Sequence, residues 1–172
     1  MFLNKLYLCF KSLISLIIKK KNNSFVIYSE NIYYFSLYQK IIENISDENI
    51  DITYLTSDLD EFRYLQNFKL KRYFIGSGII RALIFLYIKS NVFLLTLSDL
   101  DNYELKKSKK TNHYYYLFHS LQSSHVQYKF DAFKNYDHIF CNGEYHLQEI
   151  KKTELLFNFK HKNCILSGNT YF

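Results

Sequence analysis

The segment 114–125, YYYLFHSLQSSH, holds the residues best suited to do chemistry. Its apolar, aromatic run ends at Phe118 and gives way to an imidazole, small polar side chains and a second imidazole. This change is typical of a buried strand that opens into a loop, and ligands bind at the carboxyl ends of strands in open α/β sheets. Histidine exchanges protons near neutral pH, so His119 is the candidate general base.

The groups around His119 favour a binding pocket over a nucleophile. Ser120, Ser123, Ser124 and His125 follow in the same loop, and no GxSxG turn is present, which argues against a hydrolase triad. A base that acts on an acceptor hydroxyl, or a donor that steadies a phosphate, fits this loop better. The plainer alternative is that His119 hydrogen-bonds backbone at the end of its strand.

A second candidate is Gly76-Ser77-Gly78, which follows another apolar run. It lacks the third glycine of the dinucleotide-binding fingerprint, because Arg81 stands at that position. We expect either a tight strand-to-helix turn or a helix N-terminus that holds an anion with help from Arg81.

Three other polar residues have weaker signals. Asp99 and Asp101 follow a further apolar run, where their carboxylates could bind a metal ion or orient the hydroxyls of a sugar. The alternative for Asp99 is a helix cap. His146 lies in the first turn of a helical pattern, and we expect it to be exposed. The sequence shows no complete set of metal ligands, so no metal site is predicted.

The composition indicates one globular domain. Of 172 residues, 48% are hydrophobic and 19% aromatic, which argues against disorder. The net charge of +6 suits anionic partners such as phosphorylated metabolites, a membrane surface or nucleic acid, but an AT-rich genome gives the same lysine bias. Nucleic acid is the least favoured partner because no nucleic-acid-binding motif is present. Cys9, Cys141 and Cys164 lack metal-ligand spacing and are expected to be reduced thiols in a cytosolic protein.

Residues 1–22 form a predicted amphipathic helix ahead of the domain. Apolar side chains recur at helical spacing from Leu3 to Ile17, and three lysines follow at 19–21. The apolar stretch 12–18 is too short to cross a bilayer, and no small-residue cleavage site follows it. Two roles are open: a helix in a membrane interface with its lysines near anionic lipid, or a helix packed on the domain.

Residues 23–172 alternate between strand-like and helix-like segments. Strands are predicted at 25–28, 51–55, 72–75, 91–96, 113–118, 137–141 and 164–167. Helices are predicted at 33–45, 58–68 (capped by Asp58), about 79–89 and 143–153, with a polar helix or loop at 99–108. This alternation predicts an α/β fold, a Rossmann-like parallel sheet flanked by helices.

Five motifs occur in an order shared with a known family. They are LTLSDLDNY, KKSKK, YLFHSLQSSHVQY, AFKNYDHIFCNGEYHLQEI and CILSGNTYF, and the resemblance they carry covers roughly residues 24–172. In this order they resemble the CDP-glycerol glycerophosphotransferase family, which includes teichoic acid primases and polymerases. The resemblance implies a glycosyltransferase-B architecture, two Rossmann-like domains with the active site between them. This chain resembles the N-terminal, acceptor-side domain, and we expect the C-terminal domain, which holds most of the CDP-glycerol site, to be absent from it.

The resemblance also implies roles for residues. Family members carry a histidine at the position of His119, commonly in a His-Gly-Thr-Pro context, and it is thought to act as base on the acceptor hydroxyl. Here SLQ at 120–122 replaces Gly-Thr-Pro, so the loop differs in shape. The residues expected to shape the acceptor or phosphate pocket are Ser120, Ser123, Ser124 and His125, and those expected to line the cleft are Gly76, Ser77 and Gly78.

The resulting hypothesis is transfer of a polyol-phosphate unit from a CDP-activated donor, such as CDP-glycerol, to a lipid-linked or polymeric hydroxyl acceptor during cell-surface polymer synthesis. It calls for no cofactor and places the protein in the cytoplasm, peripherally at the inner face of the membrane. Two alternatives stay open. One is a non-catalytic or truncated acceptor-binding fragment that needs a separately encoded C-terminal domain. The other is a nucleotide-sugar glycosyltransferase or epimerase of the same architecture.

Overall fold

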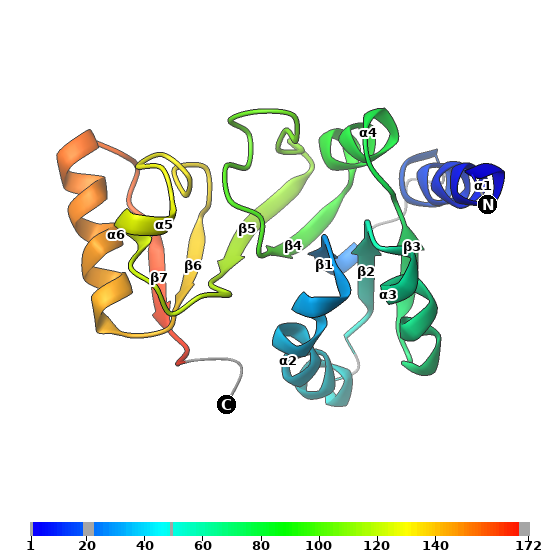
Figure 1. The fold of residues 1–172 in the computed structure, drawn as a ribbon, viewed down its shortest axis with the longest axis horizontal. Helices are drawn as coiled ribbons and strands as arrows, with labels where there is room; N and C mark the ends of the chain where they lie inside the picture. Colours follow the sequence, from blue (N-terminus) through cyan, green and yellow to red (C-terminus); the bar gives the residue numbers. More distant parts are fainter. Residues whose placement is uncertain (1, 19–22, 49, 169–172) are drawn as a thin grey trace.

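The computed structural model describes residues 2–18, 23–48 and 50–168, and its centre is a parallel β-sheet (Figure 1). Within the described residues the sheet has seven strands in the order β3-β2-β1-β4-β5-β6-β7, and every neighbouring pair is parallel. The strands are β1 (Asn23–Ser29), β2 (Ile52–Thr56), β3 (Lys71–Phe74), β4 (Ser90–Leu95), β5 (Thr111–Leu117), β6 (His138–Cys141) and β7 (Asn163–Leu166). All seven strand predictions and the Rossmann-like α/β class are confirmed.

Helices fill most of the connections between strands. They are α1 (Phe2–Leu13), α2 (Phe35–Asp47), α3 (Leu59–Tyr64), α4 (Ile79–Tyr87), α5 (Ser124–Gln127) and α6 (Glu144–Phe157), with a π-helical turn at Ile14–Ile18 and 3₁₀ turns at Ile32–Tyr34 and Leu65–Asn67. Asp58 caps α3 as expected, because its carboxylate accepts a hydrogen bond from the Asp60 amide at 2.8 Å. The segment 99–108 is a loop, so Asp99 is not a helix cap; its backbone is left-handed instead, with φ of 60°.

The strand order reverses at β1, which pairs with β2 on one side and β4 on the other. Residues of α2 and of the 3₁₀ turn after α3 pack on one face of the sheet, whereas α4, α6 and the loops around β5 pack on the opposite face. The connections therefore leave β1 and β4 in opposite directions. In open α/β sheets this arrangement opens a crevice at the carboxyl ends of those two strands.

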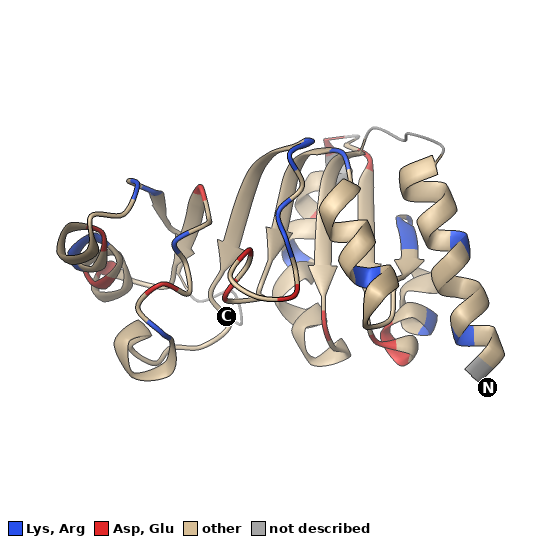
Figure 2. Cartoon of the chain, turned by 90° about the horizontal axis from the view of Figure 1, so that it is seen from above, with Lys and Arg blue, Asp and Glu red and all other residues tan. Residues whose placement is uncertain are grey.

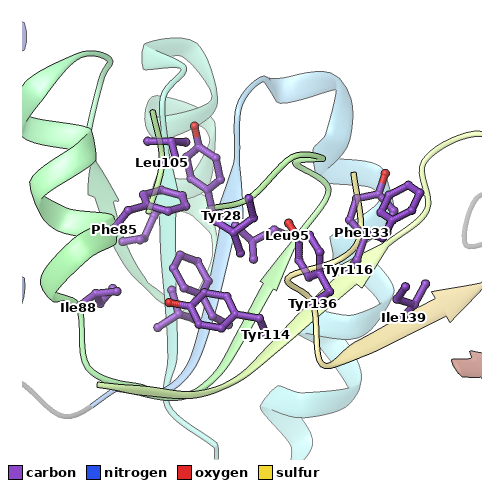
Figure 3. Close-up of a cluster of buried hydrophobic side chains, with 14 of the residues drawn as sticks. Tyr28, Phe85, Ile88, Leu95, Leu105, Tyr114, Tyr116, Phe133, Tyr136 and Ile139 are labelled. Atoms are coloured by element: carbon purple, nitrogen blue, oxygen red, sulfur yellow. The ribbon is translucent and has the colours of Figure 1, made fainter. Parts of the chain in front are cut away.

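The aromatic residues of the sequence fill the larger of the two core clusters (Figure 3). Tyr28, Tyr114 and Tyr116 are buried in it together with Phe85, and their rings meet neighbouring rings edge-on or tilted. Their hydroxyls are bonded; that of Tyr28, for example, lies 2.9 Å from the Ser57 hydroxyl. Because these tyrosines bury rings and satisfy hydroxyls, the aromatic excess has a packing role.

The smaller cluster leaves part of one sheet face open beside α2. A hollow of about 390 Å³ lies there, between Ile41 and Ile45 of α2 and the side chains of Leu94, Tyr115 and Phe140 on β4, β5 and β6. Among the described residues, no helix covers this part of the sheet. Parallel strands are normally buried on both faces, and the side chains on this uncovered face are apolar, as they are in a buried strand.

Helix α1 packs against the β3 edge and against α4. The Ser12 hydroxyl donates to the Phe74 carbonyl at 2.8 Å, and Cys9 and Leu16 are buried. This is the packed arrangement that the sequence left open. The opposite side of the helix remains exposed, at Leu3, Tyr7 and Phe10 for example. Lysines 19–21 lie outside the described residues, and within the described residues no helix is long and apolar enough to span a membrane.

Candidate functional site

His119 lies just after β5, one strand away from the reversal of the strand order. Two tyrosines from distant parts of the chain flank its ring. Tyr34 meets it edge-on with 5.1 Å between ring centroids, and the Tyr128 hydroxyl lies 3.5 Å from Nε2, at the long limit of a hydrogen bond. The other ring nitrogen, Nδ1, is buried without a hydrogen-bond partner among the described residues.

This environment favours the neutral form of the His119 imidazole. Burial lowers its pKa from the ordinary value, because an imidazolium loses hydration in this setting. A neutral imidazole can accept a proton, so the ring is in the form that a general base requires. Sequence reasoning found His119 but neither of its tyrosine neighbours, which no motif marks.

The loop that carries His119 is held by the turn between β6 and α6. Three side chains of that turn donate to three successive loop carbonyls, and this arrangement fixes the loop over residues 120–122. The bonds are Asn142 Nδ2 to the Ser120 oxygen (2.8 Å), the Tyr145 hydroxyl to the Leu121 oxygen (3.0 Å) and His146 Nε2 to the Gln122 oxygen (2.8 Å).

Glu149, one turn further along α6, continues this attachment. Its carboxylate accepts hydrogen bonds from the Ser123 hydroxyl (2.5 Å), the Ser124 amide (2.7 Å) and the Ser124 hydroxyl (2.6 Å). Both hydroxyls are thus used to fix the loop, a different task from the one expected at a substrate pocket. The signal for this contact was the spacing of residues 145, 146 and 149, which places them toward one side of α6.

His146 is buried, contrary to the prediction that it is exposed on its helix. None of its surface is accessible, and its ring stacks on Phe118 with 4.1 Å between centroids. The reason lies in the phase of α6, which turns this residue toward the end of β5. The position of a helix face relative to the sheet depends on the packing of that helix, and the helical periodicity of a short polar segment does not reveal it.

The structure does not bring Gly76, Ser77 and Gly78 near His119. They follow β3, and β2, β1 and β4 lie between β3 and β5, which corresponds to about 19 Å at the spacing of parallel strands. Gly76 has a local explanation: its φ is +58°, and a Cβ there would lie 2.8 Å from Cys9 Sγ of α1. The close approach is made by α1.

Arg81, the expected helper of an anion at these glycines, points elsewhere. Its guanidinium donates to the Tyr28 hydroxyl at 3.2 Å and to the Glu104 carboxylate at 3.4 Å, with Glu30 at 3.9 Å. These contacts connect α4 to the carboxyl end of β1 and to the loop after β4. Arg81 therefore has a role in the fold near the crevice, one that its sequence position did not suggest.

The loop after β4 places two aspartates with strained backbone at the same edge of the sheet. Asp99 and Asp101 both have left-handed backbone, which is uncommon for residues other than glycine. Asp99 Oδ2 accepts from the Ser98 hydroxyl at 3.0 Å, whereas Oδ1 is buried and has no hydrogen-bond partner in the described part of the chain. Backbone strain of this kind gathers at functional sites. Within the described residues, no three or more His, Cys, Asp or Glu side chains group as metal ligands.

Ser124 and His125 line a separate cavity of about 90 Å³ between α5 and α6. Tyr128 also lines this cavity, and the same residue flanks His119, with 6.3 Å between the two ring centroids. Of the predicted pocket residues, Ser124 and His125 therefore line this cavity, and Tyr128 connects it to His119.

Comparison of the chain with protein-family models, curated proteins and solved structures finds no match in any of the three. The fold class therefore rests on the structure alone.

Proposed function

We propose that the chain is the acceptor-side domain of a glycerophosphotransferase-like enzyme that transfers a polyol-phosphate unit from a CDP-activated donor to a hydroxyl acceptor. The observation that carries the proposal is the setting of His119: a neutral imidazole at the carboxyl edge of a parallel sheet, next to the reversal of strand order. The order of motifs shared with the glycerophosphotransferase family supplies the reaction class.

The chemistry follows from the position of His119 Nε2 beside the Tyr128 hydroxyl. A substrate hydroxyl that enters beside Tyr128 donates to Nε2, which the 3.5 Å contact engages only weakly. As the acceptor oxygen attacks the β-phosphorus of the donor, its proton passes to His119, a new phosphodiester P–O bond forms, and the bond to CMP breaks. The Tyr116 hydroxyl donates to that of Tyr128 at 3.2 Å, so the Tyr128 proton faces Nε2 and gives way when the substrate hydroxyl binds there.

The apolar surface of α1 and α4 supports a peripheral position on a membrane, where lipid-linked acceptors lie. The two helices lie side by side (Figures 1 and 2). Both expose large apolar side chains. Lys11 is exposed on α1, and Lys110 lies 5.5 Å from the centre of the exposed Tyr87 ring. Apolar groups next to lysines suit a surface of anionic lipid. The exposed side chains are Leu3, Tyr7, Phe10, Ile14 and Ile18 from the N-terminal helix and Ile79, Leu83, Leu86 and Tyr87 from α4.

A transfer assay tests the proposal, with this chain alone and with a separate donor-binding domain added. Labelled CDP-glycerol and a glycerol-phosphate-primed lipid in anionic vesicles are the substrates, and wild type, His119→Ala and His113→Ala are compared. His113 is the matched control because it is exposed near the start of the same strand. We expect His119→Ala to lose about 10²-fold or more of the rate, the range of general-base catalysis, with thermal stability nearly unchanged, and His113→Ala to retain it.

Other outcomes separate the alternatives. Transfer that survives in His119→Ala would show that the base is another residue. Activity with nucleotide-sugar donors, and none with CDP-polyols, would favour a glycosyltransferase or epimerase. A chain that transfers only after a separate donor-binding domain is added is an acceptor-binding subunit. Vesicles that sediment without the protein would refute the membrane position.

A further inference from the structure

The cavity between α5 and α6 combines a buried cation with apolar walls. Its volume of about 90 Å³ corresponds to about three water molecules, close to the size of one tetrahedral oxyanion. Phe133 and Ile150 form apolar walls, and both are buried. Lys134 and His125 lie at its exposed rim.

Lys162 is the residue that distinguishes this cavity from a packing gap. Only 6% of its surface is exposed, and burial lowers the pKa of its ammonium group. The ammonium donates to the Lys160 carbonyl at 2.9 Å, which uses one of its three protons. The nearest ring, Phe159, has its centre 5.8 Å away. The Glu154 carboxylate attracts this ammonium and raises its pKa, but burial has the larger effect. A buried cation is costly unless it is paired, and the cavity has room for a further anion.

The one carboxylate that lines the cavity is already engaged. Glu154 accepts from the Lys162 amide (2.8 Å), from His161 Nδ1 (2.6 Å) and from the Lys151 ammonium (3.2 Å), and these bonds hold the turn between α6 and β7. Lys129, a further lining residue, is exposed and donates to the Tyr103 hydroxyl. Lysines 129, 134 and 162 therefore outnumber the single carboxylate, and the cavity favours an anion.

We propose that this cavity binds the phosphate group of a small phosphate ester, with the Lys162 ammonium at its floor and Lys134 and His125 at its rim. The walls of Phe133 and Ile150 suit the C–H groups of a short polyol. The identity of the ester rests on the proposed function: Tyr128 lines this cavity and contacts His119, so a polyol phosphate held here is assigned to the acceptor whose hydroxyl reaches the base.

Calorimetric titration of the full chain with sn-glycerol 3-phosphate, inorganic phosphate and glycerol tests the proposal. We expect both phosphates to bind and glycerol not to bind. Lys162→Met keeps the aliphatic stem and should weaken phosphate binding by about tenfold or more, and Lys134→Gln by about threefold. Lys152→Gln, a change at an exposed lysine of α6 outside the cavity, is the matched control.

Three results would overturn the proposal: no phosphate binding by wild type up to about 10 mM, binding unchanged in Lys162→Met, or equal weakening in Lys152→Gln, which would indicate general surface charge. If Lys162→Met fails to fold, the exposed Lys134→Gln decides, and unchanged binding there overturns the site. Wild type that binds phosphate but transfers nothing would refute the proposed function and leave this site standing. Wild type that transfers but does not bind phosphate would refute this site and leave the proposed function standing.

Discussion

Replacing Glu149 with glutamine should loosen the loop that carries His119. The carboxylate accepts three hydrogen bonds from Ser123 and Ser124 at 2.5–2.7 Å. Glutamine keeps one acceptor oxygen, which can retain both Ser124 bonds, whereas its NH₂ group faces the Ser123 hydroxyl. One bond is therefore lost, and the other two lose the strength that the charge gives them. At roughly 1 kcal/mol net per bond, reduced for partial exposure, the free energy of unfolding should fall by about 1–2 kcal/mol. For a chain of this size this corresponds to about 2–8 °C in Tm.

The effect should depend on pH in a defined direction. Burial raises the pKa of Glu149, but the hydrogen bonds from Ser123 and Ser124 and the charge of His125 outweigh burial, and the pKa is lowered overall. A lowered carboxyl pKa contributes stability that is present above the unfolded value, near 4.3, and is lost as pH falls through the folded value. The gap between wild type and Glu149→Gln should therefore be full at pH 7 and narrow below about pH 4.5.

Urea unfolding of both proteins at pH 7, 5 and 3.5 measures this gap. Glu144→Gln is the matched control, an exposed glutamate in the first turn of the same helix, and it should unfold like wild type at pH 7. Equal midpoints for wild type and Glu149→Gln at pH 7, or a gap that stays constant down to pH 3.5, would refute the role assigned to this carboxylate.

Two further predictions concern Gly76 and His119. Gly76→Ala should lower the free energy of unfolding by about 2 kcal/mol or more, since it adds left-handed strain to a contact with Cys9, whereas Gly168→Ala, with φ of +70° and open space around it, should show the strain alone. Thermal unfolding compares them, and a Cys9→Ala background that recovers nothing would exclude the contact. By NMR titration the His119 ring should have a midpoint below 6.5, because burial lowers its pKa. The neutral ring then contributes to the free energy of unfolding fully above pH 6.5, and this contribution is lost as pH falls toward the pKa of the folded state. The free energy of unfolding of His119→Asn should therefore fall less between pH 7 and pH 5 than that of wild type. A His119 titration midpoint at or above 6.5 would contradict this.

The strands and the fold class could be predicted from the sequence because their determinants are local. Parallel strands buried on both faces require continuous apolar runs, and the runs at 25–28 and 91–96 became β1 and β4 within two residues at each end. Asp58 caps α3 through a bond to a residue two positions away. His119 could be found for the same reason, since its place at the end of an apolar run is a local property.

The sequence by itself determined which segments form strands, where each one ends and that the strands join in a parallel sheet. Only the tertiary structure decided which strand ends meet, because strand order depends on packing between segments far apart in the chain. For this reason Gly76 lies three intervening strands from His119, while Tyr34 and Tyr128 flank it. The same packing sets the phase of α6, which buries His146 and turns Glu149 toward the serines of the loop.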